Sequence, residues 1–122
     1  MAVEPQRILV IDDEHMVAKT LGRVLKGHEV TLTETVDHAL TLVNERVFDI
    51  IFCDMMMPGL GGMDLYLAMA RLHPEILSRL VLMTGGAYTS KAQVFMNSVP
   101  NHVVYKPFDI MEIRELVKQM TI

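Results

Sequence analysis

The stretch FCDMMMPG, residues 52–59, is an apolar run that ends on one carboxylate, Asp54, and then breaks into a Pro-Gly turn. The apolar run begins earlier, at Ile50 and Ile51, so it has the composition of a β-strand that is buried on both faces. A carboxylate at the end of such a strand loses hydration unless a cation or several hydrogen-bond donors lie beside it. The sequence therefore predicts a site around Asp54.

Apolar runs alternate along the chain with segments of helical period. Strands are expected at residues 8–11, 29–33, 49–53, 80–83 and 103–105, and helices over 17–25, 36–47, 65–72, 92–99 and 110–120. The second strand alternates polar and apolar residues where the first is solidly apolar, which is typical of an edge strand. This α/β alternation predicts right-handed crossovers onto a doubly wound parallel sheet, with helices on both faces and the strand order 2-1-3-4-5.

Length and composition limit the class of protein. A chain of 122 residues predicts one domain, residues 1–122, and the net charge of −4 argues against binding of nucleic acid by this domain. No apolar run approaches the roughly 18 residues that cross a bilayer, and no signal-peptide core is present, so we expect a cytoplasmic domain without membrane contact. Cys53 is the single cysteine, which excludes an internal disulfide and a thiolate metal site built from this chain alone.

Polar side chains follow four of the expected strands. The first strand ends in Asp12 and Asp13, the third in Asp54, the fourth in Thr84 and the fifth in Lys106. In an open parallel sheet these ends meet in a crevice where ligands bind. Three converging carboxylates need a divalent cation, for which oxygen ligands and room for water favour Mg²⁺. The lysine and the threonine hydroxyl suit a phosphoryl group bound beside that cation.

The chain resembles the receiver domain of two-component response regulators in four motifs that follow in order: Asp12-Asp13-Glu14, Asp54 with Met57-Pro58-Gly59, Thr84-Gly85, and Lys106-Pro107-Phe108. The resemblance covers the whole chain and implies the flavodoxin-like (βα)5 fold. Residues 82–109 look most like receivers at the C-terminus of hybrid sensor histidine kinases. That likeness implies a longer parent protein, which could be a membrane-anchored kinase.

The resemblance implies that Asp54 accepts a phosphoryl group from a phosphohistidine on a histidine kinase or a histidine phosphotransfer domain. Such a domain catalyses its own phosphorylation and dephosphorylation and is not a turnover enzyme. By the same resemblance, Mg²⁺ is held by Asp13, Asp54 and the backbone carbonyl of Met56, with Asp12 acting through bound water. The downstream partner is not named by the sequence.

The resemblance also implies a switch. Lys106 is expected to pair with the phosphoryl group and Thr84 to move toward it, which alters binding by the face of the fourth helix, fifth strand and fifth helix. Many receivers have an aromatic residue where this chain has Val103, whereas Tyr105 shares the strand parity of Val103 and is the candidate to replace it. The bond from Lys106 to Pro107 is expected to be cis by resemblance.

Other interpretations stay open at this point. Each motif also occurs as an ordinary helix start or turn: acidic residues 12–14 favour a helix N-terminus, and Asp54 suits a turn before Pro-Gly. A haloacid-dehalogenase-type phosphatase also uses a strand-end aspartate, but Met56 stands where that family has its second aspartate. A phosphorylation-independent interaction module on the same fold is the remaining alternative.

Overall fold

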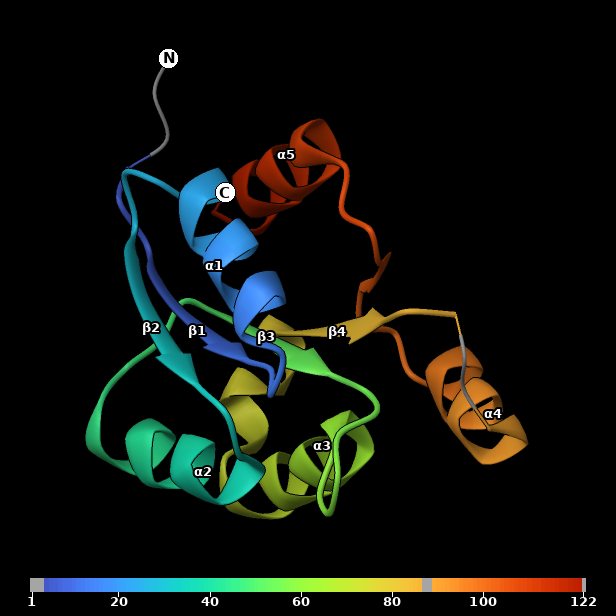
Figure 1. Cartoon of the computed structure of the whole chain (residues 1–122). Helices are drawn as coiled ribbons and strands as arrows, with labels where there is room; N and C mark the ends of the chain where they lie inside the picture. The colour runs from blue at the N-terminus through green and yellow to red at the C-terminus, as the bar shows by residue number, and fades with distance from the viewer. Residues whose placement is uncertain (1–3, 87–88, 122) are drawn as a thin grey trace.

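Strands and helices alternate along the chain, as the apolar pattern predicts. The structure, a computed structural model, describes residues 4–86 and 89–121 (Figure 1). In chain order the elements are β1 (Arg7–Ile11), α1 (His15–Val24), β2 (Glu29–Thr33), α2 (Val36–Glu45), β3 (Ile50–Asp54), α3 (Gly62–Leu72), the short 3-10 helix η1 (Pro74–Arg79), β4 (Leu80–Thr84), α4 (Ser90–Ser98), β5 (Val103–Tyr105) and α5 (Ile110–Thr121).

The five strands form one parallel sheet in the order β2-β1-β3-β4-β5, which confirms the predicted topology. The polar and apolar alternation of β2 correctly marked it as an edge strand. Phe52 in the central strand β3 pairs in register with Val10 of β1 and with Val81 of β4. The carboxyl ends of these three strands therefore lie together at one edge of the sheet.

Helices cover both faces of the sheet, α1 and α5 on one and α2, α3 and α4 on the other (Figure 1). The strand period of two divides the side chains of β3 between these layers. Ile50 and Phe52 pack in the cluster that contains residues of α1 and α5, whereas Ile51 and Cys53 pack in the cluster of α2, α3 and α4. All five residues of β3 are buried, because both of its faces are covered.

Most predicted bounds lie within three residues of those observed, and the clearest departures are the end of α2 and one additional helix. Helix α2 ends at Glu45 and not at Val47, whose apolar side chain continues the helical spacing but is 63% exposed. Phe48 is buried instead, because the chain becomes extended at Arg46 before it enters β3. The helix η1 was not predicted, and it begins with Pro74 at its first turn, a position that needs no backbone donor.

The loop from β3 to α3 folds tightly against the end of β3. A side chain at Gly61 would overlap the carbonyl oxygen of Met55, so only glycine fits this approach. The Gly61 N–H donates to the Asp64 carboxylate at 2.8 Å, which fixes the start of α3. This loop holds the residues that follow Asp54 beside the edge of the sheet.

Among the described residues, no helix is long and apolar enough to cross a membrane. The longest helix, α5, has 12 residues, against about 20 for a transmembrane helix.

Candidate functional site: an acidic pocket at the strand ends

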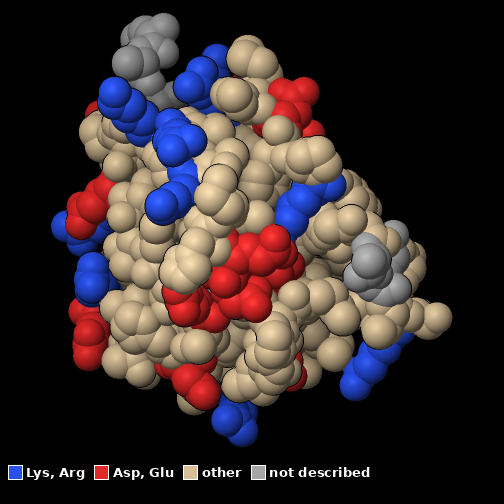
Figure 2. Space-filling model, in the orientation of Figure 1, with Lys and Arg blue, Asp and Glu red and all other residues tan. Residues whose placement is uncertain are grey.

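Three carboxylates meet where β1 and β3 end. Asp12 and Asp13 follow β1, Asp54 closes β3, and oxygen atoms of all three lie within 4.8 Å of one another. Asp12 and Asp54 are buried, whereas Asp13 is exposed at the mouth of the group. Figure 2 shows acidic side chains gathered at the centre of this face of the molecule. The structure thus brings together the three aspartates that the sequence placed at the strand ends.

Asp12 also shapes the backbone around it. Its N–H donates to the carbonyl of Thr33 at 3.0 Å, which extends the pairing of β1 with β2 by one residue. Its Oδ1 accepts a hydrogen bond from the Glu14 N–H at 2.9 Å, at the residue that caps α1. Asp12 therefore orders the turn before α1 as well as belonging to the carboxylate group, although no acidic side chain caps the helix itself.

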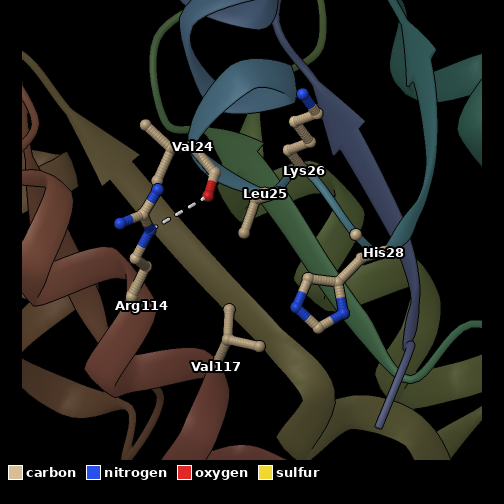
Figure 3. A pocket seen from close by; sticks show the side chains of 7 residues that line it. Val24, Leu25, Lys26, His28, Arg114 and Val117 are labelled. Carbon is tan, nitrogen blue, oxygen red and sulfur yellow. Dashed lines mark hydrogen bonds between the residues drawn. The ribbon is translucent and has the colours of Figure 1, made fainter. Parts of the chain in front are cut away.

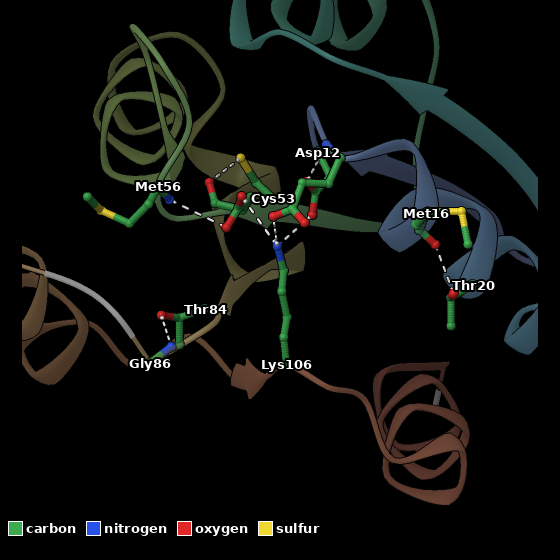
Figure 4. A network of polar contacts seen from close by, with 10 residues as sticks. Asp12, Met16, Thr20, Cys53, Met56, Thr84, Gly86 and Lys106 are labelled. Carbon is green, nitrogen blue, oxygen red and sulfur yellow. Dashed lines mark hydrogen bonds and ion pairs between the residues drawn. The ribbon is translucent and has the colours of Figure 1, made fainter.

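Lys106 reaches this group from the end of β5 (Figure 4). Its Nζ lies 2.8 Å from Asp12 Oδ2 and 3.3 Å from Asp54 Oδ2, and Glu14 Oε1 is 3.7 Å away. The lysine side chain is only 13% exposed. The sequence predicted Lys106 as the counter-charge of a phosphoryl group but missed its ion pairs with Asp12 and Asp54 in the free site.

Burial and charge set the protonation of these groups. Burial raises the pKa of Asp54 and the Asp12 carboxylate raises it further, while the Lys106 ammonium opposes both effects. Burial acts to lower the pKa of Lys106, but the Asp12 and Asp54 carboxylates outweigh it and raise that pKa above its ordinary value. The lysine therefore stays charged, and it opposes the rise that burial and Asp12 cause in the pKa of Asp54.

The other predicted site residues surround Asp54. The Met56 N–H donates to Asp54 Oδ1 at 3.4 Å, so the loop after β3 contacts the carboxylate through its backbone. Thr84 is buried at the end of β4, next to β3 in the sheet, and its hydroxyl oxygen accepts from the Gly86 N–H at 3.4 Å. No hydrogen bond joins Thr84 to Asp54 among the described residues.

The two candidate switch residues of β5 differ in environment. Val103 packs against the cluster under α2, α3 and α4, whereas Tyr105 is 55% exposed. Tyr105 is nevertheless the register partner of Thr84 in the sheet. Its role as the switch aromatic stays a prediction. The bond from Lys106 to Pro107 is cis, as expected.

We expect Asp54→Asn to stabilise the fold at pH 7. Because the pKa of Asp54 is raised in the folded state, the folded chain binds more protons than the unfolded chain between the two pKa values, and stability falls as pH rises through that window. Asparagine removes the buried charge while Asp12 and Glu14 still hold Lys106. Thermal unfolding followed by circular dichroism is expected to show a midpoint about 3 °C higher at pH 7 and a smaller gain at pH 4. A lower midpoint at pH 7 would contradict the proposed cost of that charge.

Comparison with known proteins identifies the family. Residues 8–118 match the family model described as the response regulator receiver domain. The DNA-binding response regulator MtrA of Mycolicibacterium smegmatis is 31% identical over 110 residues, which are 88% of this chain and 47% of that protein. The chain thus spans about half the length of this relative.

Two further relatives match over nearly their whole length. Sporulation initiation phosphotransferase F of Bacillus subtilis is 28% identical over 116 residues, 93% of this chain and 92% of that protein. The crystal structure of the response regulator TrrA of Thermotoga maritima, in complex with Mg²⁺-BeF, superposes with a TM-score of 0.79 at 26% identity, covering 98% of that chain and 94% of this one. The chain belongs to the response regulator receiver domain family of two-component signalling.

Proposed function

We propose that Asp54 is the phosphoacceptor of this receiver domain. Receiver domains obtain their phosphoryl group from histidine kinases or phosphotransfer proteins, and the donor proposed here is a phosphohistidine on such a partner. The observation that supports this most is the placement of Lys106 within 3.3 Å of the buried Asp54, beside Asp12 and Asp13. Lys106 favours the carboxylate form of Asp54, and a carboxylate oxygen can act as a nucleophile.

The transfer forms one bond and breaks another. A carboxylate oxygen of Asp54 attacks the phosphorus, the phosphorus–nitrogen bond of the phosphohistidine breaks, and the imidazole nitrogen keeps the electron pair. The product is an acyl phosphate on Asp54 and a histidine that can take up a proton. Lys106 pairs with the transferred oxygens, and Thr84, one strand away, donates its hydroxyl to them.

The carboxylate group fits Mg²⁺ by the chemistry of its donors, because hard oxygen ligands with an exposed side suit that ion. We propose that Asp13, Asp54 and the Met56 carbonyl hold it, with Asp12 acting through water or remaining with Lys106. When bound, Mg²⁺ neutralises the negative charge that the carboxylates and the incoming phosphoryl group share. The Mg²⁺-BeF complex of TrrA supports this proposal by similarity.

The other functions are less well supported. A phosphatase of the haloacid dehalogenase type lacks support because Met56 stands two residues after Asp54. An interaction module that works without phosphorylation would need none of the Lys106 ion pairs, which the structure contains. The origin of the chain in a hybrid histidine kinase and its cytoplasmic location both stay predictions.

Phosphorylation is proposed to change partner binding at the face of α4, β5 and α5. Tyr105 and Met111 lie on this face and are 55% and 71% exposed. The acyl phosphate adds a charge of about −1.5 to −2 within reach of Lys106, which directly precedes the loop into α5. Lys106 thereby connects the acceptor to β5.

The test is phosphorylation by a small acyl phosphate. The wild-type chain is incubated with acetyl phosphate and Mg²⁺, and intact-mass spectrometry is expected to show one added phosphoryl group. Removal of Mg²⁺ with a chelator is expected to abolish the adduct, and Asp13→Asn is expected to reduce its rate by about tenfold or more, because a ligand of the cation is lost.

A matched control is Asp37→Asn, which removes an exposed carboxylate from the first turn of α2. This variant is expected to form the adduct at the wild-type rate. An adduct that forms equally well without Mg²⁺ would contradict the metal proposal, and no adduct under any condition would contradict the proposed function.

A further inference from the structure

A pocket lined by basic and apolar residues lies at the opposite end of α1 from the carboxylates. It has a volume of about 340 Å³ and lies between the turn after α1 and the inner side of α5 (Figure 3). Its lining residues are Val24, Leu25, Lys26, Gly27, His28, Arg114 and Val117. The volume falls in the range of small-molecule sites, which begins at about 300 Å³.

Three of the residues that line this pocket, Lys26, His28 and Arg114, have side chains that can donate hydrogen bonds. His28 Nδ1 accepts the Gln6 N–H at 2.9 Å, so the proton of the neutral ring is on Nε2, which can donate. Arg114 donates its Nε–H to the Val24 carbonyl at 3.4 Å, and its terminal N–H groups have no hydrogen-bond or ion-pair partner among the described residues. Lys26 is exposed at the rim. No carboxylate is among the lining residues.

The C-terminal carbonyl groups of α1 repel an anion less strongly than those of a helix whose last carbonyls have no hydrogen-bond donor. A helix C-terminus has a partial negative charge because its last carbonyls lack donors. Here the carbonyls of Leu21, Arg23 and Leu25 accept the N–H groups of Leu25, Lys26 and His28. The Val24 carbonyl accepts a hydrogen bond from Arg114 Nε.

The segment of α1 and the turn after it is positively charged although the chain as a whole is negative. Residues 15–28 contain three lysines or arginines and no acidic residue. Figure 2 shows basic side chains gathered over α1 at the upper left, apart from the acidic centre. Since α1 has 10 residues, the two ends of the helix are separated by about 15 Å.

We propose that this pocket binds a small phosphorylated anion. The phosphate lies between the guanidinium of Arg114 and the His28 ring, with Lys26 at its outer side, and the apolar side chains of Val24 and Val117 contact the rest of the ligand. An arginine fork recognises phosphate oxygens in pairs, which favours phosphate over a monovalent anion. A small ligand fits better than a protein segment because these residues line a hollow of about 340 Å³ and not a flat face.

This site would act independently of the phosphoacceptor, so it is tested without Mg²⁺ and without a phosphodonor. Pyrophosphate is added to ¹⁵N-labelled chain at physiological ionic strength, where screening suppresses diffuse attraction beyond about 8 Å. Saturable changes are expected at the amide signals of residues 24–28 and 114. Glycerol, which has no charge, is expected to cause none.

Two charge-removing variants separate the pocket from the general basic surface. Arg114→Gln is expected to weaken pyrophosphate binding by about tenfold, as for the loss of one charge-assisted hydrogen bond. Lys118→Gln removes the same charge one turn later on α5 but does not line the pocket, and is expected to change affinity less than about twofold. Lys26→Gln serves as a second pocket variant if Arg114→Gln does not fold. Changes that do not saturate, or equal weakening by Lys118→Gln, would overturn the proposal.

Discussion

Asp54→Asn is expected to abolish the phosphoryl adduct that acetyl phosphate and Mg²⁺ produce on the wild-type chain. The asparagine side chain has nearly the same shape, but it is neutral and its oxygen is a poor nucleophile. No neighbouring group replaces it easily: Asp12 is tied to Lys106 at 2.8 Å and to the Glu14 N–H, and Asp13 is exposed at the edge of the group. The loss of phosphorylation should therefore be complete within detection.

The measurement is intact-mass spectrometry on both proteins under the same conditions. Thermal unfolding shows that the variant is folded, because Asp54→Asn is expected to be more stable at pH 7 and not less. An adduct of equal amount on the variant would show that another residue is the acceptor. A reduced adduct on a stably folded variant would indicate that Asp12 or Asp13 can substitute.

Lys106→Met is expected to destabilise the fold by about 3 kcal/mol at pH 7.5, because it leaves two buried carboxylates without a cation. The side chains of Asp12 and Asp54 are 0% and 5% exposed, so little water contacts the two carboxylates to replace the ammonium. Without Lys106 the pKa of Asp54 rises further, since the one charge that opposes its burial is gone. The loss should be smaller at pH 5, where more of the carboxylate is protonated, and smaller again with saturating Mg²⁺.

Urea unfolding at both pH values, with and without Mg²⁺, measures these differences. Lys118→Met removes an exposed lysine from α5 and is expected to change stability by less than about 0.5 kcal/mol. The double variant Asp54→Asn/Lys106→Met should regain part of the stability, because one of the two unpaired charges is removed. A loss that does not depend on pH would point to lost packing of the lysine stem and not to its charge.

The fold could be predicted because strand-like apolar runs alternate regularly with segments of helical period, and because the strands differ in how continuously apolar they are. The apolar run of β3 and the alternating pattern of β2 place these strands at the centre and the edge of the sheet, and the structure has them there. The site could be predicted for a related reason. Once the strands are parallel and ordered, residues at their carboxyl ends must meet, however far apart they are in sequence.

What could not be predicted depends on packing between segments. Val47 continues the stripe of α2 in sequence, but the chain turns at Arg46 to bury Phe48, and only the position of the sheet decides this. The ion pair of Lys106 with Asp12 depends on which of several carboxylates the lysine can reach. The pocket between the turn after α1 and α5 depends on how closely these two segments approach each other, for which the sequence has no signal.

Lys106 also helps to attach the edge strand β5 to the rest of the sheet. Strand β5 has only three residues and pairs with one neighbour, β4, so few backbone bonds attach this margin of the sheet. Lys106 bonds backward to the Thr84 carbonyl through its N–H at 2.8 Å and forward, through Nζ, to aspartates that follow β1 and β3. Lys106 thus links β5 across β4 to the ends of β1 and β3. Negative charge added by a phosphoryl group on Asp54 would strengthen the attraction to Lys106. The order of β5 would then depend on whether Asp54 is phosphorylated.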